Sequence, residues 1–559
     1  PALGCGMIIG IDMGGTNIDG VLIHDGALLK TVKHQVDRTD SAQCAWRCLF
    51  ELLEGVDKRL ISRVHLSTTV CTNAIVEGTT AETAVVLQAG PGMRWLFDRM
   101  GDHVHHVSGS VDHRGILVAE EDREELRHVR DTLRQHPVGA MAVVGKFSTR
   151  NPGFERRARD FFVEVCPHIT MGHSLSGKLN FPRRVQTAYL NAAVSATFAA
   201  FAGSVKQALA QEGIAMPVHV LKADGGTVSL DGALEKPVET ILSGPAASFM
   251  GMAALCPQDQ SDRVLLDIGG TTTDIFFLMG GDAVFEPEGI EIDGRKTLVR
   301  AVFSRSIGVG GDSHVRFEND ALKIGPRRLG SAIAFGGQHL TSTDALVYLG
   351  AMKGRKVVES RMALENMAEE RGMAPYRLAE DIVAQACGII RDAVQAILKK
   401  LNNSPVYTIR ELLADRAICP RAVSLIGGPA RAFAPYIERT LGLPVAYPEG
   451  FEVANAIGAA LARPTLEVSL HADTARGLLM VPEMEVYEKI GRDFDLSKAK
   501  AQALNLAMQA GQTLGFSPDQ AEVEIVEASS FNMIDGFHSA GKNIRVRAQI
   551  KPGLLRRLA

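Results

Sequence analysis

The sequence predicts an α/β protein built from two copies of one lobe with a cleft between them, followed by a small C-terminal α+β domain. Two observations support this prediction. A short apolar run that ends in Asp, a Gly pair and polar side chains occurs twice, at Met7–Asp19 and at Arg263–Asp274. Beyond residue 464, apolar runs typical of strands surround one amphipathic stretch. We therefore expect a first lobe over residues 1–185, a second over 186–463 and an accessory domain over 464–559.

The composition is that of an ordinary globular protein. The chain has 559 residues, enough for two or three domains, and 46% of them are hydrophobic. A net charge of −4 gives no electrostatic reason to bind nucleic acid or an anionic membrane, so neither is expected as a partner. The eight cysteines are scattered and require no oxidising compartment, so we expect a cytoplasmic protein. The uncharged stretch 188–205 contains Asn191 and many small residues, which favours a buried helix between the lobes over a membrane span.

The second copy of the repeated run has the features of a phosphate-binding strand and turn. Four apolar residues in a row predict a buried strand. The adjacent Gly269 and Gly270 allow a tight turn whose backbone N–H groups face an anion. The hydroxyls of Thr271 and Thr272 can add hydrogen bonds to phosphate oxygens. Asp267 at the strand end is placed to hold Mg²⁺ through water, because that ion keeps much of its hydration shell.

The first copy repeats this order, with an apolar strand, Asp12, a turn over residues 14–17 and then Asp19. Two such turns that face each other would hold a polyphosphate and its metal ion from both sides. This duplicated arrangement resembles the ribonuclease H-like superfamily of actin, sugar kinases and heat-shock chaperone ATPases. The resemblance implies two actin-like ATPase lobes, with ATP and Mg²⁺ bound in the nucleotide cleft between them.

Strands and helices are predicted to alternate between the two copies. The expected elements are strands at Gly20–His24, Ala27–Val32, Arg63–Ser67, Thr83–Leu87 and Ala140–Gly145, helices at Ser41–Glu54 and Pro182–Gln211, and a strand from Val218 that ends in Asp224-Gly225-Gly226. The polar region 90–137 contains a cluster of histidines, among them His103 and His106, which could bind a metal. Without carboxylate or cysteine spacing, we interpret this region as a solvated loop.

Two stretches of small residues, Ser243–Ser248 and Val453–Ala460, predict helices that can approach each other closely. In the superfamily such helices meet at the hinge between the lobes. The strand Val423–Ile426 ends in Gly427-Gly428, a turn that suits close approach to an adenosine. The accessory domain is expected to contain strands at Thr465–Ala472, Gly477–Val481, Glu522–Val526 and Asn543–Ile550 around a helix at Leu496–Leu514.

Four further stretches narrow the resemblance to the hydantoinase A/5-oxoprolinase family: Thr68–Ala74, Ser243–Ala246, Gly308–Ser313 and Thr343–Ala345. The similarity covers roughly residues 7 to 462. Three positions depart from the family pattern. Leu66-Ser67 replaces a His-Gly, Asp224 replaces an Asn, and no Asp-Pro-Gly-Pro run follows Pro326.

The resemblance implies an ATP-dependent hydrolase that opens a cyclic amide of the hydantoin or 5-oxoproline type. A ring amide is a weak electrophile, and transfer of the γ-phosphoryl group to its carbonyl oxygen activates the ring for attack by water. The expected partners are a small cyclic amide and either a second, hydantoinase B-like subunit or further copies of this chain. No Ser-His-Asp or Cys-His signature is apparent, in agreement with ATP chemistry rather than acyl-enzyme chemistry.

The candidate site residues fall into four groups. The nucleotide ligands are Gly14, Gly15, Thr16, Asn17, Gly269, Gly270, Thr271, Thr272, Gly310, Gly311, Gly427 and Gly428. The metal ligands are Asp12, Asp267 and Asp274, and the catalytic candidates are Asp12, Asp267, Asp224 and Asp312. Thr68, Thr69 and Asn73 are the candidate substrate contacts, with helix capping as the alternative role.

Two other functions remain open at this point. One is a small-molecule kinase of the same fold, in which Asp312 would deprotonate a substrate hydroxyl. The other is an ATPase subunit of a carboxylase-type complex, whose nucleotide cycle drives a partner protein.

Overall fold

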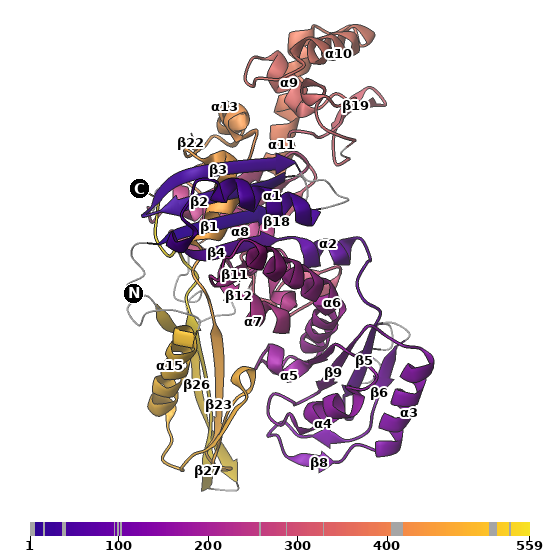
Figure 1. Ribbon diagram of the computed structural model, residues 1–559, viewed down its shortest axis with the longest axis vertical. Helices are drawn as coiled ribbons and strands as arrows, with labels where there is room; N and C mark the ends of the chain where they lie inside the picture. Colours follow the sequence, from indigo (N-terminus) through magenta and orange to yellow (C-terminus); the bar gives the residue numbers. More distant parts are fainter. Residues whose placement is uncertain are drawn as a thin grey trace.

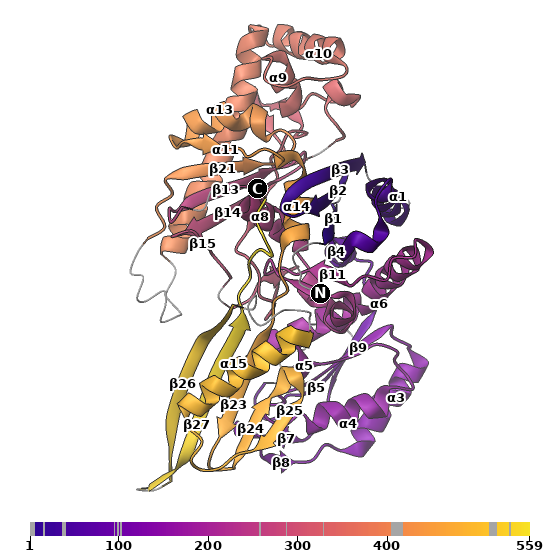
Figure 2. The same ribbon diagram turned by 60° about the vertical axis from the view of Figure 1, so that its left-hand side comes forward.

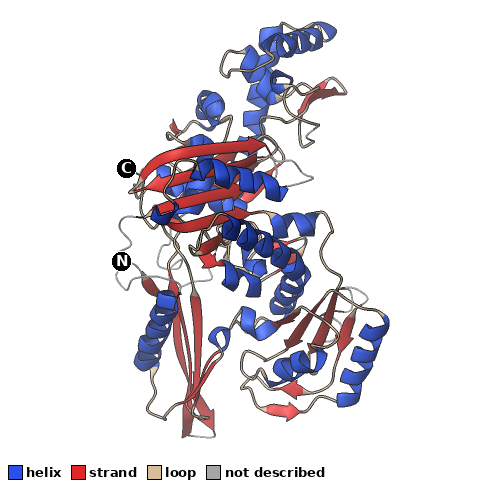
Figure 3. Cartoon of the chain, in the orientation of Figure 1, coloured by secondary structure: helices blue, strands red, loops and turns tan. Residues whose placement is uncertain are grey.

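The computed structural model describes residues 6–14, 17–35, 41–93, 96–97, 100, 103–256, 259–286, 288–327, 329–403, 417–513, 522–535 and 538–558. The candidate ligands Gly15 and Thr16 lie outside these residues. Two sheets that carry the repeated runs occupy the middle of the molecule. A third sheet and the C-terminal sheet lie below them in Figure 1. Figure 3 shows that strands and helices alternate through most of the chain, as expected for an α/β protein.

The first sheet has the order β12-β11-β4-β1-β2-β3. Its strands are β1 (Met7–Met13), β2 (Asn17–His24), β3 (Ala27–Gln35), β4 (Ile61–Thr68), β11 (Val218–Leu221) and β12 (Thr227–Ser229). Strand β1 pairs antiparallel with β2 and parallel with β4, so the first run forms a hairpin beside a parallel strand. The helices α1 (Ser41–Leu53) and α6 (Phe181–Gln211) contribute to the hydrophobic core on one face of this sheet.

The second sheet repeats the central arrangement of the first. Its order is β15-β14-β13-β21-β22, with β18 (Arg305–Ile307) also paired to β14. The strands are β13 (Arg263–Ile268), β14 (Thr273–Met279), β15 (Asp282–Ala283), β21 (Ala422–Ile426) and β22 (Val445–Ala446). Strand β13 pairs antiparallel with β14 and parallel with β21, as β1 does with β2 and β4. Its core includes residues of helices α9 (Ser342–Tyr348), α10 (Val357–Glu370), α11 (Pro375–Asn402) and α13 (Ala430–Leu441).

Two helices of small residues, α8 (Ser243–Leu255) and α14 (Ala454–Leu461), pack against each other between these sheets. A Cβ added at Gly251 would overlap the carbonyl of Ala454, and one added at Gly458 would overlap that of Ala247. Only glycine permits this approach, and the predicted contact between the two helices is confirmed. In Figure 2, α8 and α14 lie between the β13–β21 sheet and the β1–β2 hairpin.

The third sheet is wholly parallel and is inserted between β4 and α6 in the sequence. Its order is β10-β9-β5-β6, from β5 (Thr83–Gln88), β6 (Val104–His106), β9 (Ala140–Gly145) and β10 (Ile169–Met171). The helices α3 (Arg123–Gln135), α4 (Gly153–Phe162) and α5 (Gly172–Leu175) belong to the same unit, which we call the inserted unit.

The interpretation of residues 90–137 as a solvated loop is wrong in four places, two of which are the short strands β7 (Ser110–Val111) and β8 (Leu117–Ala119). Strand β6 and helix α3 both lie in this region. Helix α3 buries Leu126, Val129 and Leu133, which share one face at helical spacing, and the side chain of Asp122 caps its first turn. The surrounding charges obscured this apolar stripe in the sequence. Among the described residues, no group of three His, Cys, Asp or Glu side chains could hold a metal ion.

Helix α6 is long and apolar enough to cross a membrane, but half of its most apolar window is buried inside the structure. Phe198 and Val194 contribute to the core of the first sheet, whereas Val185 and Ala188 contribute to that of the inserted unit. The predicted burial is confirmed, but the helix joins the core of the first sheet to that of the inserted unit rather than to the core of the second sheet.

The predicted division at residues 185 and 186 falls inside α6. The strands β11 and β12 follow that helix in sequence but complete the first sheet, because β11 pairs in parallel with β4. Strand pairing thus places the end of the first sheet after Ser229 rather than at residue 185. Such a long-range pairing leaves no mark in the local sequence.

The C-terminal sheet is antiparallel, with the order β25-β24-β23-β27-β26. Its strands are β23 (Glu467–Asp473), β24 (Leu478–Val481), β25 (Val486–Lys489), β26 (Val523–Asp535) and β27 (His538–Ile550). Helix α15 (Leu496–Thr513) covers one face of this sheet. The predicted α+β architecture is present, although β25 was missed and β26 and β27 extend further than expected.

Candidate functional site

Aspartates occupy matching positions on the two hairpins. Asp12 on β1 lies opposite Asp19 on β2, and Asp267 on β13 lies opposite Asp274 on β14. Each pair sits one residue from the end of its antiparallel register. The repeated runs therefore place two carboxylates side by side at the end of each hairpin.

The turns of the two hairpins are closed in the same way. The backbone N–H of Gly14 donates to the carbonyl of Asn17 over 3.1 Å, and that of Gly269 donates to Thr272 over 2.9 Å. These four residues hold equivalent places in the two copies. The tight turns predicted from the Gly pairs are present, apart from Gly15 and Thr16, which lie outside the described residues.

The Asp12 carboxyl is only 4% exposed, and its Oδ1 has no hydrogen-bond partner among the described residues. The pKa of Asp12 is raised to about 7, mainly by burial and also by the nearby carboxylates of Asp19 and Asp267. The hydroxyl of Ser67 and the amide of Asn455 oppose this shift. A buried acidic group with one unused oxygen and two acidic neighbours is an environment that a cation would stabilise.

The carboxyls of Asp267 and Asp274 also have raised pKa values. Burial raises the pKa of Asp267, although Ser248 Oγ donates to its Oδ2 over 2.6 Å. The pKa of Asp274 is raised to about 7, mainly by burial and also by the charge of the Asp267 carboxylate. The Ser306 side chain, on β18, lowers the pKa of Asp274 by hydrogen bonding.

Three residues that complete this arrangement were not predicted as site residues. Asn455, on α14, lowers the pKa of both Asp12 and Asp267 by hydrogen bonding and so connects the two hairpins. Ser248 approaches Asp267 from α8. Lys33, on β3, forms an ion pair with Asp19, with its Nζ 2.8 Å from Oδ1. For Asn455 and Ser248, the available signal was a polar residue within a helix of mostly small, apolar side chains.

The loop containing Gly310 and Gly311 lies directly against the second turn. The N–H of Gly311 donates to the carbonyl of Gly269 over 2.9 Å, and the N–H of Asp312 donates to that of Gly270 over 2.6 Å. A Cβ added at Gly270 would lie 2.8 Å from Oδ2 of Asp312, so the glycine leaves room for this carboxylate. The structure thus brings Asp312 to the second hairpin.

The Gly427-Gly428 turn ends β21 beside the same hairpin. Gly427 has a φ of 97°, and a Cβ there would lie 2.7 Å from Oδ1 of Asp267. A Cβ added at Gly428 would meet no heavy atom within 4 Å. One glycine therefore packs over the carboxylate, while the next borders open space.

The Thr68–Asn73 segment touches both the first hairpin and the start of α8. The hydroxyl of Thr69 donates to the carbonyl of Met13 over 3.2 Å and accepts from Nδ2 of Asn73 over 3.2 Å. Thr68 is 2% exposed, and its Oγ1 accepts from the N–H of Val70, at the start of α2 (Val70–Val76). Thr68 thus serves the backbone, whereas Asn73 is exposed beside the hairpin.

The surroundings of Asp224 favour a structural role over the catalytic one predicted from the sequence. Its carboxylate accepts from the N–H of Gly226 over 2.9 Å and from Thr465 Oγ1 over 3.0 Å. Burial alone would raise its pKa, but Lys222 and other partners hold that pKa below its ordinary value. Asp224 therefore ties the first sheet to the start of the C-terminal domain.

The hairpin aspartates do not form a cage of protein ligands for a metal ion, because the described residues contain no such group of three. Mg²⁺ is usually held by one or two carboxylates together with phosphates and water. The unused, buried Oδ1 of Asp12 fits a role of this kind. Asp12 and Asp267 are the residues that would hold the ion.

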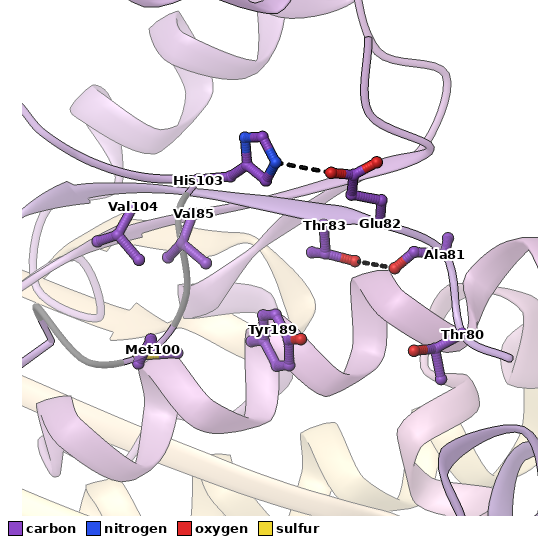
Figure 4. A pocket seen from close by; sticks show the side chains of 9 residues that line it. All are labelled: Thr80, Ala81, Glu82, Thr83, Val85, Met100, His103, Val104 and Tyr189. Carbon is purple, nitrogen blue, oxygen red and sulfur yellow. Dashed lines mark hydrogen bonds and ion pairs between the residues drawn. The ribbon is translucent and has the colours of Figure 1, made fainter. Parts of the chain in front are cut away.

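Two cavities lie away from the hairpins. A cavity of about 250 Å³ lies between β5, β6 and α6, where Glu82 and His103 are 2.7 Å apart (Figure 4). A second, of about 410 Å³, is lined by Phe317, Asp320, Leu322, Met373, Leu378, Asp381 and Gln385. Neither contains a predicted site residue.

Comparison with curated proteins finds distant relatives that are named as subunits, one of a caprolactamase and one of a carboxylase. The chain is 24% identical to the caprolactamase subunit alpha of Pseudomonas jessenii, over 76% of this chain and 65% of that protein. It is also 24% identical to the acetophenone carboxylase gamma subunit of Aromatoleum aromaticum, over 70% of this chain and 59% of that protein. The chain thus spans about two thirds or less of the length of these relatives.

Solved structures share the whole fold at low identity. Nucleotide-free acetone carboxylase superimposes with a TM-score of 0.72 and 16% identity, covering 99% of this chain and 88% of that one. The ATP-dependent caprolactamase of Pseudomonas jessenii gives a TM-score of 0.70 and 19% identity, covering 97% of this chain and 87% of that one.

The model of the hydantoinase/oxoprolinase N-terminal region matches residues 8–166, and the hydantoinase/oxoprolinase model matches residues 184–468. Together these matches span both hairpins, most of the inserted unit and the Gly427-Gly428 turn. The chain belongs to the hydantoinase/oxoprolinase family.

Proposed function

We propose that the chain binds ATP with Mg²⁺ between its two hairpin-bearing sheets and uses it to open a cyclic amide. The observation that carries this proposal is the matched geometry of the hairpins. Asp12 and Asp267 hold equivalent positions, both are buried, and both interact with Asn455. In this proposal the two sheets are duplicated actin-like lobes, and the protein works in the cytoplasm.

The chemistry explains the need for ATP. A five-membered lactam or imide resists attack by water, because its carbonyl is a weak electrophile. Transfer of the γ-phosphoryl group to the carbonyl oxygen forms the C–O–P bond of an imidate-like phosphate. One water then adds at that carbon and the ring C–N bond breaks, which leaves an acyl phosphate. A second water hydrolyses this acyl phosphate to a carboxylate and free phosphate. The products are the open-chain amide or amino acid, ADP and phosphate.

The residues of the two hairpins divide this work. The backbone N–H groups of the Gly-rich turns would bind the phosphates, while Asp12 and Asp267 would hold Mg²⁺ at the transferring group. The ion supplies positive charge that stabilises the phosphate oxygens during transfer. Gly428 borders the open space where an adenosine would approach. The close packing of α8 on α14 would let the lobes rotate and exclude water.

The substrate is proposed to bind beside Thr69 and Asn73. Thr69 is held against Met13, next to the first hairpin, so a ring in contact with Asn73 would lie close to the γ-phosphate. A hydroxyl and an amide can together bond the N–H and the carbonyl of a cyclic amide. Asp312, beside Gly270, is proposed as the group that positions the attacking water.

A second subunit is proposed to complete the enzyme. The two relatives compared above are named as subunits, one alpha and one gamma. A hydantoinase B-like chain is the proposed partner, and assembly of this chain with copies of itself is the alternative.

A carboxylase-type role is the second candidate function. The fold match to acetone carboxylase and the relationship to an acetophenone carboxylase subunit favour it. In this role the same hairpin site would activate a ketone or bicarbonate, and turnover would require the partner subunit.

The deciding experiment incubates the pure protein with ATP, Mg²⁺ and a panel of cyclic amides, and measures phosphate release together with ring opening. Lactam-dependent phosphate release supports the cyclic amidase. A stable phosphorylated product would identify the kinase alternative. Activity that appears only with a partner subunit, a ketone and bicarbonate would identify the carboxylase role and refute the amidase.

A further inference from the structure

The C-terminal sheet has two different faces, and both are covered. Alternation along β23 places Val468 and Leu470 in the apolar core under α15, so His471 and Asp473 point to the opposite side. His471 is 8% exposed and Asp473 is 1% exposed. A polar sheet face would ordinarily be solvated, but this one is buried against another part of the protein.

That other part is the carboxyl edge of the inserted parallel sheet. Strand β9 ends at Gly145, and the chain then runs through Thr149 and Arg150 into α4. In Figures 1 and 2 the inserted unit and the C-terminal sheet both lie below the hairpin sheets. Their interface is therefore separate from the proposed ATP site.

Two contacts tie this edge to the polar face. Arg114 lies between β7 (Ser110–Val111) and β8 (Leu117–Ala119), and its Nη2 is 3.4 Å from Oδ2 of Asp473. The next residue, Gly115, packs against Arg150, because a Cβ added there would lie 2.8 Å from the Arg150 carbonyl. Arg114 and Arg150 are thereby held at the same place.

Buried donors at this edge have no partners. Arg150 is 6% exposed, and its Nη1 has no hydrogen-bond acceptor among the described residues. Thr149 is 1% exposed, and its Oγ1 has no partner in the same part of the chain. A buried guanidinium nitrogen without an acceptor is unfavourable, so a group that accepts hydrogen bonds would stabilise this edge.

The charge balance points the same way. The carboxylate of Asp473 interacts with the guanidinium groups of both Arg114 and Arg150, and the charge of Arg545 also acts on Arg150. The pKa of Arg150 is lowered to about 9, mainly by burial and also by the charge of Arg545, against the opposing effect of Asp473. Arg150 still carries its charge at neutral pH. Three arginines therefore accompany two acids at this edge, Asp473 and Asp112, whose carboxylate accepts from the backbone N–H of Arg114.

We propose that this edge binds a small oxyanion, a carboxylate or a phosphate, through Arg150 and Thr149, with the exposed Arg545 at its solvent side. Ligands of open α/β sheets bind beyond the carboxyl ends of the strands, where Thr149 and Arg150 lie. Guanidinium and hydroxyl groups are the donors that oxyanions take most readily. A bound oxyanion would also join the inserted unit to the C-terminal sheet.

The test is calorimetric titration of the full chain with inorganic phosphate, bicarbonate and acetate at constant ionic strength in chloride. We expect saturable binding of at least one of them, and the tightest binder identifies the oxyanion. Arg150→Gln should weaken that binding about tenfold or more, because it removes the charged donor. Thr149→Val, which keeps the charge, should weaken it less, and it serves if Arg150→Gln does not fold.

Two controls separate this site from others. Asp267→Asn changes the proposed ATP site and should leave oxyanion binding unaltered. Arg59→Gln removes an arginine whose side chain is 89% exposed and should also have no effect. The proposal is overturned if the wild type binds none of the anions, if Arg150→Gln binds them equally well, or if Asp267→Asn alone abolishes binding.

Thermal unfolding provides a second test, in which a variant of Arg150 is expected to be more stable than the wild type when no oxyanion is added. In chloride alone, Arg150→Met should raise the melting temperature, because it removes a buried charge without an acceptor. Adding the oxyanion should raise the melting temperature of the wild type but not that of the variant. A lower melting temperature for Arg150→Met in chloride would show that Arg150 is already paired, and would rule the site out.

Discussion

Asp12 and Asp267 end strands in two different sheets, yet the charge of Asp267 contributes to the raised pKa of Asp12. Burial is the larger cause, and Asn455 stabilises the ionised form of both carboxylates. Because each buried carboxylate is close enough to affect the other, the two repel each other when both are ionised. A cation between them, or a proton on one of them, would relieve that repulsion.

Replacing Asp267 with Ala should leave the fold intact and remove nearly all ATP turnover. The carboxylate is proposed to hold Mg²⁺ at the transferring phosphate, and loss of such a preorganised charge lowers rates by ~10² or more. Steady-state phosphate release and circular dichroism would measure the two properties. An unchanged rate would show that the hairpin is only structural.

The stability of the ligand-free protein should fall as pH rises from about 4 to about 7. Asp12 has a folded pKa of about 7 against an ordinary value of 3.8, so the folded state binds a proton that the unfolded state has released. This contribution is complete below the unfolded pKa and is lost as pH rises through the folded pKa. Its size is on the order of 4 kcal/mol.

Denaturant unfolding near both ends of that pH range would measure the effect. The Asp12→Asn variant stays neutral, so its stability should depend less on pH than that of the wild type. Parallel pH profiles for the two proteins would contradict the assignment.

The contact between α8 and α14 should be intolerant of a single added methyl group. Gly458→Ala would overlap the Ala247 carbonyl and should destabilise the fold by ~1–3 kcal/mol. Gly388→Ala, within α11, is the matched control, because no heavy atom lies within 4 Å of the added Cβ. That change should be neutral or stabilise by up to ~1 kcal/mol. Equal effects on the melting temperature would argue against a close crossing.

Binding of nucleotide should close the two hairpin-bearing sheets about α8 and α14. The small side chains on both helices allow them to pivot without interlocking, and ATPases of this kind close around their ligand. Solution X-ray scattering should show a smaller radius of gyration with ADP and Mg²⁺ than without. Superimposable profiles would refute closure.

The substrate assignment can be separated from the ATP assignment by combining Thr69→Val with Asn73→Ala. Loss of these two contacts should cost ~2–4 kcal/mol of transition-state binding in the substrate-dependent reaction. Substrate-independent ATP hydrolysis should change little. If both rates fall together, or neither changes, then the two residues only support the start of α2.

Much of the candidate site could be predicted because its chemistry is local. An apolar strand, an Asp and a Gly turn are contiguous, and register then places Asp12 opposite Asp19 and Asp267 opposite Asp274. Asn455 and Ser248 could not be recognised in this way. Each is a polar residue in a helix of mostly small, apolar side chains, and its role depends on where that helix packs.

Asp224 is a residue whose local sequence pattern predicted a catalytic role, whereas its surroundings favour a structural one. Its sequence, an Asp followed directly by two glycines after a strand, resembles that of the hairpin aspartates, which have one residue between the Asp and the Gly pair. Its carboxylate nevertheless bonds to Thr465, which is far away in the chain. A local pattern gives the shape of a turn, but it does not reveal which distant side chain occupies the space beyond it.

The two hairpins, the small-residue helices and the α+β character of the C-terminal region could be predicted from the sequence alone. Backbone preferences and side-chain periodicity, on which those predictions rest, act within a few residues. Two relationships became apparent only in the folded structure: β11 and β12 complete the first sheet, and Arg150 lies beside Asp473. These relationships arise from burial, which brings distant segments together and sets the charge and hydrogen bonding that each side chain meets.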